Sequence, residues 1–487
     1  MAVTLLYSAF YKDWRTFYMY HIDFTKPIHV HFIGIGGISM SGLAELLHTK
    51  GFTVSGSDAK DSKIVDHLRQ LGIKIFIGQK AENITKDIDL VVYTAAVKSD
   101  NVEYQAVQKY NIPMLDRADF LGQVMLQYKN AIGISGTHGK TTTTSMVSLM
   151  MLEGNFDPTI SVGGILDNIE GNIRIGHSEN FIVESCEYKN SFLSFNPSHA
   201  IILNIEEEHL DYFKDIEDIR NSFHTFAKKL PDYGNLVIWG GIDRYEELTK
   251  DLSCHVITYG MFSSEEERKE NVNRYDYAAC NVSSDDFGLR SYDLYKYGKF
   301  VDRISLGVIG DHNVLNSLAA ISLVDTLGGS MSAIKKGLLA FKGTERRFER
   351  KGVLNGITIV DDYAHHPSEI KATLTAASSY PHKDIWCVFQ PHTYTRTKSF
   401  FHDFTTSLAL ADKIVLADIY AAREENPGDI SSKDIQRELL KIGKEAYYFS
   451  NFKEIEKFLL EHCTNGDLLI TMGAGDVVSI GESLLQK

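Results

Sequence analysis

The stretch AIGISGTHGKTTTTSM, residues 131–146, passes within a few positions from an apolar run through glycines to a lysine and four threonines. Its first five residues are small or β-branched and predict a short buried strand, and apolar residues recur at helical spacing after Lys140. Gly136 and Gly139 therefore lie in a strand-to-helix turn. The free N–H groups and the positive dipole end at the start of such a helix favour bound phosphate.

This turn departs from the usual phosphate-binding loop at one position. Ile134 stands where the usual pattern has a glycine, five residues before Gly139. The order of strand, turn, lysine, threonine and helix is kept. Lys140 is suited to neutralise the terminal phosphates, and the Thr141 hydroxyl is suited to bind Mg²⁺. We therefore expect a nucleoside triphosphate site rather than a plain glycine-rich turn.

The composition predicts a protein of two or three domains. A chain of 487 residues is too long for one ordinary core, and 44% hydrophobic and 23% charged residues are typical of globular proteins. No apolar run is long enough to span a membrane, and a net charge of −14 argues against nucleic acid as the main partner. The five cysteines are scattered without a CxxC pair, which fits a reducing cytoplasm.

Residues 1–26 precede the first predicted strand and lack the pattern of a signal peptide. They contain a second methionine, Met19. We expect Met19 to be the natural first residue, and residues 1–18 to be present because translation was taken to start at an upstream codon.

Residues 28–58, IHVHFIGIGGISMSGLAELLHTKGFTVSGSD, have the order of a Rossmann-type unit: strand, glycine turn, helix and second strand. Gly34 and Gly36 allow the tight turn, Ser39 replaces the third glycine, and Asp58 ends the second strand. A nicotinamide dinucleotide and a UDP diphosphate both fit this pattern. A glycine turn that only packs a helix closely fits it as well.

Polar residues end the strands that follow the phosphate-binding turn. Glu184 ends one predicted strand, and His209 lies just beyond the next. Ligands gather at the carboxyl ends of the strands in an open parallel sheet, so both side chains can join Thr141 around a metal ion and phosphate. Taken alone, an acid or histidine in such a place is more often a cap or a surface group.

Later segments carry further polar residues with open assignments. Asn313 and Asn316 share one face of a helix start, where they can read a purine edge or only cap the helix. The basic pair Arg346 and Arg347 can reach a phosphate across a domain junction or remain solvated. A third α/β segment places a second candidate wall at its strand ends, made of Asp361, Asp362, His365, His366, His392 and Arg396.

Eight sequence blocks occur in the order found in the Mur ligases, and the chain resembles this family from about residue 27 to 487. The resemblance implies an α/β protein with an N-terminal Rossmann-like domain, a central P-loop ATPase-type domain with a mostly parallel sheet, and a C-terminal Rossmann-like domain. We expect an extension over 1–26 and domains over 27–122, 123–330 and 331–487. The blocks are HFIGIGGISMSGLAE, GTHGKTTT, ESCEYKNSFL, NIEEEHLDYF, GDHNVLN, GTERRFE, DDYAHHP and FQPHTYTRT.

The resemblance further implies an ATP- and Mg²⁺-dependent ligase of peptidoglycan precursor synthesis. It would join L-alanine to the lactyl carboxylate of UDP-N-acetylmuramate through an acyl phosphate, with Lys140, Glu184, His209 and Arg347 as catalytic residues. The implied nucleotide-sugar site is Gly34, Gly36, Gly37, Ser39 and Asp58, and the implied metal ligands are Thr141, Glu184 and His209. The implied ATP site is Gly136, Thr137, His138, Gly139, Lys140, Thr141, Thr142, Asn313, Asn316, Arg347 and Asp362. The implied amino-acid site is His365, His366, His392 and Arg396, and the residues do not decide which histidine assists loss of the amine proton.

Two departures from the family pattern and three rival functions remain open. Ser39 changes the turn expected to bind the diphosphate, and Thr393 stands where the family commonly has an arginine in the amino-acid site. A recycling ligase that joins a whole peptide to the same nucleotide sugar usually has an insertion between the glutamate and histidine strands, whereas Glu184 and His209 are only 25 residues apart here. The other rivals are a non-catalytic nucleotide-binding partner and a dinucleotide-dependent oxidoreductase, which leaves the phosphate-binding turn unexplained.

Overall fold

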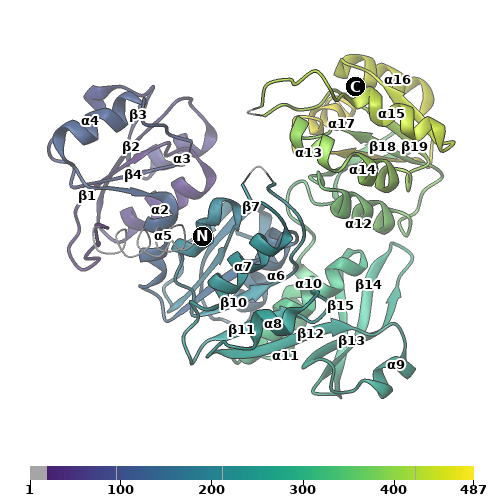
Figure 1. Ribbon diagram of the computed structural model, residues 1–487, viewed down its shortest axis with the longest axis horizontal. Helices are drawn as coiled ribbons and strands as arrows, with labels where there is room; N and C mark the ends of the chain where they lie inside the picture. The colour runs from purple at the N-terminus through teal and green to yellow at the C-terminus, as the bar shows by residue number, and fades with distance from the viewer. Residues whose placement is uncertain (1–18, 95, 170, 211, 423, 487) are drawn as a thin grey trace, which may run out of the picture.

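Three α/β domains follow one another along the chain, each built on its own sheet, in a computed structural model of the protein. In Figure 1 the N-terminal domain lies at the upper left, the C-terminal domain at the upper right, and most of the central domain below them. This confirms the predicted fold class. The structure describes residues 19–94, 96–169, 171–210, 212–422 and 424–486. Residues 1–18, in which we expect a non-native extension, lie outside the described residues.

The N-terminal domain is a five-stranded parallel sheet in the order β3-β2-β1-β4-β5. Helices α2 and α5 pack on one face, where they share a hydrophobic cluster with the sheet. The glycine turn follows β1 and leads into α2, as the Rossmann-type pattern predicts. The strands are β1 (His29–Ile33), β2 (Thr53–Asp58), β3 (Lys74–Ile77), β4 (Leu90–Tyr93) and β5 (Met114–Asp116), and the helices are α2 (Ile38–Thr49), α3 (Lys63–Gln70), η1 (Ala81–Asn83), α4 (Val102–Tyr110) and α5 (Arg117–Met125).

The central domain has ten strands in the order β15-β14-β13-β12-β11-β10-β6-β9-β7-β8. The middle strands are parallel, and antiparallel pairs close both edges. The strands are β6 (Asn130–Ser135), β7 (Thr159–Leu166), β8 (Gly171–Arg174), β9 (Asn180–Glu184), β10 (His199–Ile202), β11 (Asn235–Trp239), β12 (His255–Met261), β13 (Tyr277–Ser284), β14 (Leu289–Lys296) and β15 (Lys299–Ile309). The helices are α6 (Lys140–Glu153), η2 (Asp167–Ile169), η3 (Tyr188–Ser194), α7 (Ile216–Ala227), α8 (Tyr245–Thr249), α9 (Glu265–Glu270), α10 (Asp311–Thr326) and α11 (Met331–Ala340).

The C-terminal domain has six strands in the order β16-β17-β21-β18-β19-β20, all parallel except the β16–β17 pair. Hydrophobic clusters cover both faces of the sheet. The strands are β16 (Glu349–Leu354), β17 (Ile357–Asp362), β18 (Ile385–Phe389), β19 (Lys413–Leu416), β20 (Glu445–Tyr448) and β21 (Leu468–Met472). The helices are α12 (Pro367–Ala377), α13 (Tyr394–Ser399), α14 (Phe401–Leu408), α15 (Ser432–Lys441), α16 (Phe452–His462) and α17 (Val478–Leu485).

The junction between the N-terminal and central domains is closely packed. Helix α5 approaches η3 of the central domain so tightly that a Cβ on Gly122 would lie 2.0 Å from the carbonyl oxygen of Ser194. At the other junction, Ile334 and Leu338 of α11 belong to the hydrophobic cluster of the central domain. Helix α11 therefore packs with the central domain, although it follows the expected boundary at residue 330.

Among the residues that the structure describes, no helix is both long and apolar enough to cross a bilayer.

Candidate active site

The turn between β6 and α6 needs glycine at two positions. Gly136 has φ 144° and Gly139 has φ 84°, values that disfavour a side chain. A Cβ on Gly139 would lie 2.7 Å from Asn316 Oδ1, so the turn packs directly on the second turn of α10. The backbone N–H of His138 donates to Asn204 Oδ1 at 2.7 Å, which ties the turn to the chain leaving β10. Tertiary contacts thus fix the turn from both sides.

Lys140 begins α6, and its ammonium group turns back toward the glycine turn. It donates to the carbonyl oxygens of Gly136 and Thr137, the latter at 3.0 Å, and lies 3.0 Å from Glu187 Oε2. Burial alone would lower the pKa of Lys140, but the surrounding acidic groups, Glu187 foremost, together outweigh burial and the net pKa is raised. Lys140 is therefore cationic and available to a phosphate that replaces its present partners.

Glu184 and Thr141 bring two oxygen atoms together beside Lys140. The Thr141 hydroxyl donates to Glu184 Oε2 at 3.2 Å, and the backbone N–H of Gly163 donates to Glu184 Oε1 at 2.6 Å. Burial raises the pKa of Glu184, and the Gly163 and Thr141 hydrogen bonds oppose that rise. A carboxylate and a hydroxyl next to a phosphate-binding turn suit a hard divalent cation such as Mg²⁺.

His209 reaches this site through Glu187, a residue that the sequence analysis missed. His209 Nε2 is 3.6 Å from Glu187 Oε1, and its ring packs on Tyr188 with ring centroids 4.5 Å apart. Only 3% of the Glu187 side chain is exposed. Glu187 thus joins Lys140 to His209. Its position three residues after Glu184, in the block ESCEYKN, was the only available signal in the sequence.

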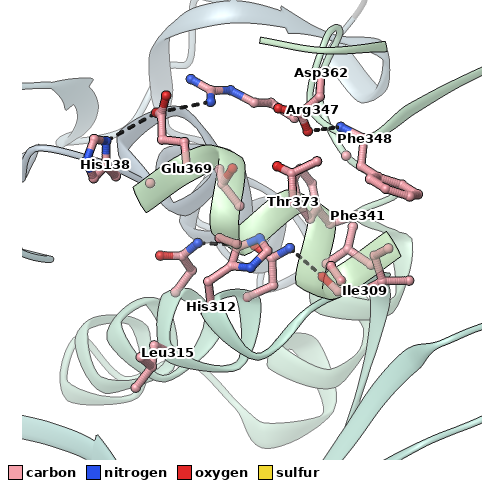
Figure 2. A pocket seen from close by; sticks show the side chains of 18 of the residues that line it. His138, Ile309, His312, Leu315, Phe341, Arg347, Phe348, Asp362, Glu369 and Thr373 are labelled. Carbon is pink, nitrogen blue, oxygen red and sulfur yellow. Dashed lines mark hydrogen bonds and ion pairs between the residues drawn. The ribbon is translucent and has the colours of Figure 1, made fainter. Parts of the chain in front are cut away.

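The C-terminal domain contributes a second wall at the start of α12. Glu369 accepts hydrogen bonds from the backbone N–H groups of His365 and His366 in a capping box, at 3.0 and 3.3 Å. Its other oxygen lies 3.2 Å from His138 Nδ1 and 3.6 Å from Arg347 Nη1. Figure 2 shows Glu369 between His138 and Arg347. The sequence analysis did not identify Glu369, which links the phosphate-binding turn to the C-terminal domain.

Arg396 and His392 lie beside the same wall. The Arg396 guanidinium donates to Glu208 Oε1 at 2.7 Å and 3.1 Å, and its Nη1 lies 3.0 Å from His392 Nδ1. Burial opposes ionisation of Glu208, but Arg396, together with smaller contributions from His366 and His209, outweighs burial and lowers the pKa of Glu208 to about 2. Thr393 is the N-cap of α13 and accepts a hydrogen bond from the backbone N–H of Arg396. The only expected arginine of this wall is therefore paired with an acid of the central domain.

A cavity of about 500 Å³ opens between α10 and the C-terminal domain (Figure 2). Asn313 donates to the Ile309 carbonyl oxygen at 2.8 Å, and Asn316 donates to Asn313 Oδ1 at 3.1 Å. Asp362 accepts backbone hydrogen bonds from Phe348 and Ala364, and burial raises its pKa to about 6. The lining also includes His138, Gly139, Thr142, Arg347 and Glu369. Most of the residues expected around ATP thus border one cavity.

Models of protein families match all three domains of the chain. The description "Mur ligase family, catalytic domain" matches residues 29–129, "Mur ligase middle domain" matches 134–324, and "Mur ligase, glutamate ligase domain" matches 346–475. The chain belongs to the Mur ligase family. This result confirms the resemblance seen in the eight sequence blocks.

Two relatives and one solved structure are closely similar to this Mur ligase. A UDP-N-acetylmuramate–L-alanine ligase of Lachnoclostridium phytofermentans is 93% identical, over 96% of this chain and 100% of the relative. The ligase of the same name from Lachnospira eligens is 56% identical over the same shares. The crystal structure of the UDP-N-acetylmuramate–alanine ligase MurC of Thermotoga maritima has a TM-score of 0.77 and 30% identity, and covers 94% of this chain and 98% of its own.

The glycine turn of the N-terminal domain in this Mur ligase is closed by Asp58. The backbone N–H of Gly36 donates to Asp58 Oδ2 at 2.9 Å, and Gly34 has φ 84°. Gly37 is the N-cap of α2, and Ser39 in its first turn accepts a hydrogen bond from Arg117 at 3.2 Å. Four of the five residues expected to hold the nucleotide sugar therefore lie in this turn and the start of α2, and Asp58 reaches the turn from the end of β2. Their ligand remains a prediction.

Proposed function

We propose that this Mur ligase joins L-alanine to the lactyl carboxylate of UDP-N-acetylmuramate, with conversion of ATP to ADP and phosphate, in peptidoglycan precursor synthesis. The observation that carries this proposal is the near-identity, over 96% of the chain, to a relative that is named for this reaction. The Lys140–Glu187–His209 cluster beside the glycine turn, with the buried Glu187 at its centre, supports a catalytic rather than a purely binding role.

The first half of the reaction activates the carboxylate. The lactyl carboxylate attacks the γ-phosphorus of ATP, an acyl phosphate forms, and ADP leaves. Lys140 neutralises charge on the phosphoryl oxygens, which is the main demand of phosphoryl transfer on a protein. Thr141 and Glu184 would hold Mg²⁺, with His209 at a second position, and the ion would screen the phosphate charge. Arg347 would contact a phosphate, Asn313 and Asn316 the adenine, and Asp362 the ribose.

The second half of the reaction consumes the acyl phosphate. The amino group of alanine attacks the acyl carbon, phosphate leaves, and the amine proton passes to a base. Burial lowers the pKa of His366 and His392 to about 4 and lowers the pKa of His365, so all three rings are neutral near pH 7 and able to accept a proton. Arg396 would bind the alanine carboxylate after exchange of its present partner, Glu208.

We assign binding of the nucleotide sugar to the domain over residues 27–122 and binding of ATP to the domain over 123–330. The domain over 331–487 would bind the amino acid and close over ATP. Because α11 packs with the central domain, we move the second boundary to follow Phe341, which also lies in that hydrophobic cluster.

We propose that the reaction takes place in the cytoplasm. All five cysteines are free thiols in the structure, in keeping with a reducing compartment.

A direct test is to incubate the protein with ATP, Mg²⁺, UDP-N-acetylmuramate and one amine at a time, and to weigh the product. L-Alanine should give UDP-N-acetylmuramoyl-L-alanine. Product formed only with a murein tripeptide would instead identify the recycling ligase, and no product with any amine would identify a non-catalytic partner. The short segment between Glu184 and His209 favours the single amino acid.

A further inference from the structure

Two histidines and a glutamate from three separate segments converge where the central and C-terminal domains meet. His138 lies in the phosphate-binding turn, Glu206 follows β10, and His366 is the N-cap of α12. One ligand atom from each lies within 4.8 Å of the other two. His138 Nε2 is 3.5 Å from Glu206 Oε2, and the centroids of the two imidazole rings are 4.8 Å apart.

These separations suit a tetrahedral metal ion. Metal–ligand bonds of about 2.1 Å place neighbouring ligand atoms of a tetrahedron about 3.4 Å apart. The Ser368 hydroxyl lies 2.7 Å from His366 Nδ1 and 3.0 Å from His138 Nε2, so both ring nitrogens point to one spot. A bound ion would lie between these nitrogens, with Ser368 Oγ or water as a further ligand.

The outer nitrogen of each ring faces an acid, as it does in metal-bound histidines, but only that of His138 lies within hydrogen-bond distance. His138 Nδ1 lies 3.2 Å from Glu369 Oε1, which orients Nε2 toward Glu206. His366 Nε2 and Glu208 Oε2 are both buried and 4.0 Å apart, and among the described residues neither has a hydrogen-bond partner. If Nδ1 of His366 binds an ion, Nε2 must carry a proton, and Glu208 is the acid that can accept its hydrogen bond.

We propose that His138, Glu206 and His366 form a binding site for a divalent transition-metal ion of the Zn²⁺ type. Two imidazoles and one carboxylate favour such an ion over Mg²⁺, which prefers oxygen ligands. The site differs in residues from the Mg²⁺ position proposed at Thr141 and Glu184, and it does not depend on the identity of the amino-acid substrate. Because its ligands come from two domains, a bound ion would tie α12 to the phosphate-binding turn.

The test uses Co²⁺ as a spectroscopic probe on the full chain, stripped with a chelator and then held in excess Mg²⁺. We expect one Co²⁺ per chain, with the intense visible absorption of a tetrahedral site, and its displacement by Zn²⁺. Glu206→Gln and His366→Asn should each weaken Co²⁺ binding by at least tenfold. Asparagine is a good N-cap, so His366→Asn keeps the start of α12 while it removes the imidazole.

Two further variants serve as controls, and thermal unfolding in the absence of metal verifies that all variants fold. Glu207→Gln changes an exposed neighbour of Glu206 and should bind Co²⁺ like the wild type. His209→Ala should also keep the absorption, because His209 belongs to the proposed Mg²⁺ region. The proposal is overturned if the wild type gives no tetrahedral absorption. It is equally overturned if His209→Ala abolishes the absorption while Glu206→Gln and His366→Asn retain it.

Discussion

Lys140 Nζ lies 3.0 Å from Glu187 Oε2, and the opposite oxygen of the same carboxylate lies 3.6 Å from His209 Nε2. One buried acid therefore positions the cation of the phosphate-binding turn and the histidine of the neighbouring strand end. Neither contact joins residues that are close in sequence. Lys140 and His209, which the sequence predicted as site residues, are connected through Glu187, which it did not predict.

Glu187→Gln should lower kcat by ten- to a hundredfold. Loss of a charged hydrogen bond to a buried lysine costs about 1.5–3 kcal/mol, which corresponds to a rate factor on the order of ten to a hundred. The measurement is ADP release under saturating substrates. Glu153→Gln, at the exposed end of α6, is the matched control and should keep wild-type turnover. A kcat within twofold of wild type for Glu187→Gln would contradict the positioning role.

Lys140→Ala should abolish turnover and leave the binding of UDP-N-acetylmuramate largely intact, since the nucleotide sugar is assigned to another domain. Calorimetric titration with the nucleotide sugar measures binding, and thermal unfolding verifies the fold. Turnover within tenfold of wild type would remove Lys140 from the mechanism.

Arg396→Ala should raise the alanine concentration needed for half-maximal rate on the order of a hundredfold, because paired charged hydrogen bonds to the substrate carboxylate are lost. The first half-reaction should survive. Positional isotope exchange in ATP, with UDP-N-acetylmuramate present and alanine absent, measures it. Lys398→Ala, which removes a mostly exposed cation two residues away, is the control. If Arg396→Ala loses exchange as completely as Lys140→Ala, Arg396 acts on ATP or on domain closure.

The protein should lose stability as the pH falls from 6.5 toward 4, in part through His199. Burial lowers the pKa of His199 to about 4. Between pH 6.5 and pH 4, His199 is therefore protonated in the unfolded chain but neutral in the folded chain, so protonation favours unfolding. The loss amounts to as much as about 3 kcal/mol at and below pH 4. Chemical unfolding of wild type and His199→Gln at pH 7 and pH 4.5 measures it. The wild type should lose more stability than the variant, and equal losses would exclude His199 as the cause.

The sequence was sufficient for the features that local chemistry controls. A strand, two glycines with positive φ and a lysine at a helix start are enough to predict a turn of the phosphate-binding type from a few neighbouring residues. The order of the three α/β domains also follows from local hydrophobic patterns and from the eight blocks in their family order. The same local logic predicted that Glu184 and Thr141 lie near each other, because each lies at an end of a regular element beside the turn, and the structure brings the two side chains into contact.

Only the tertiary structure decided which polar residues act together across those elements. Residues 206–208 are three consecutive glutamates, which the sequence cannot rank. In the fold Glu206 faces His138, Glu207 is exposed, and Glu208 is buried against Arg396. The path of the chain after β10 and the approach of the C-terminal domain set these differences. Burial and a partner from a distant segment give each carboxylate its role, and neither property is present in the sequence of the loop itself.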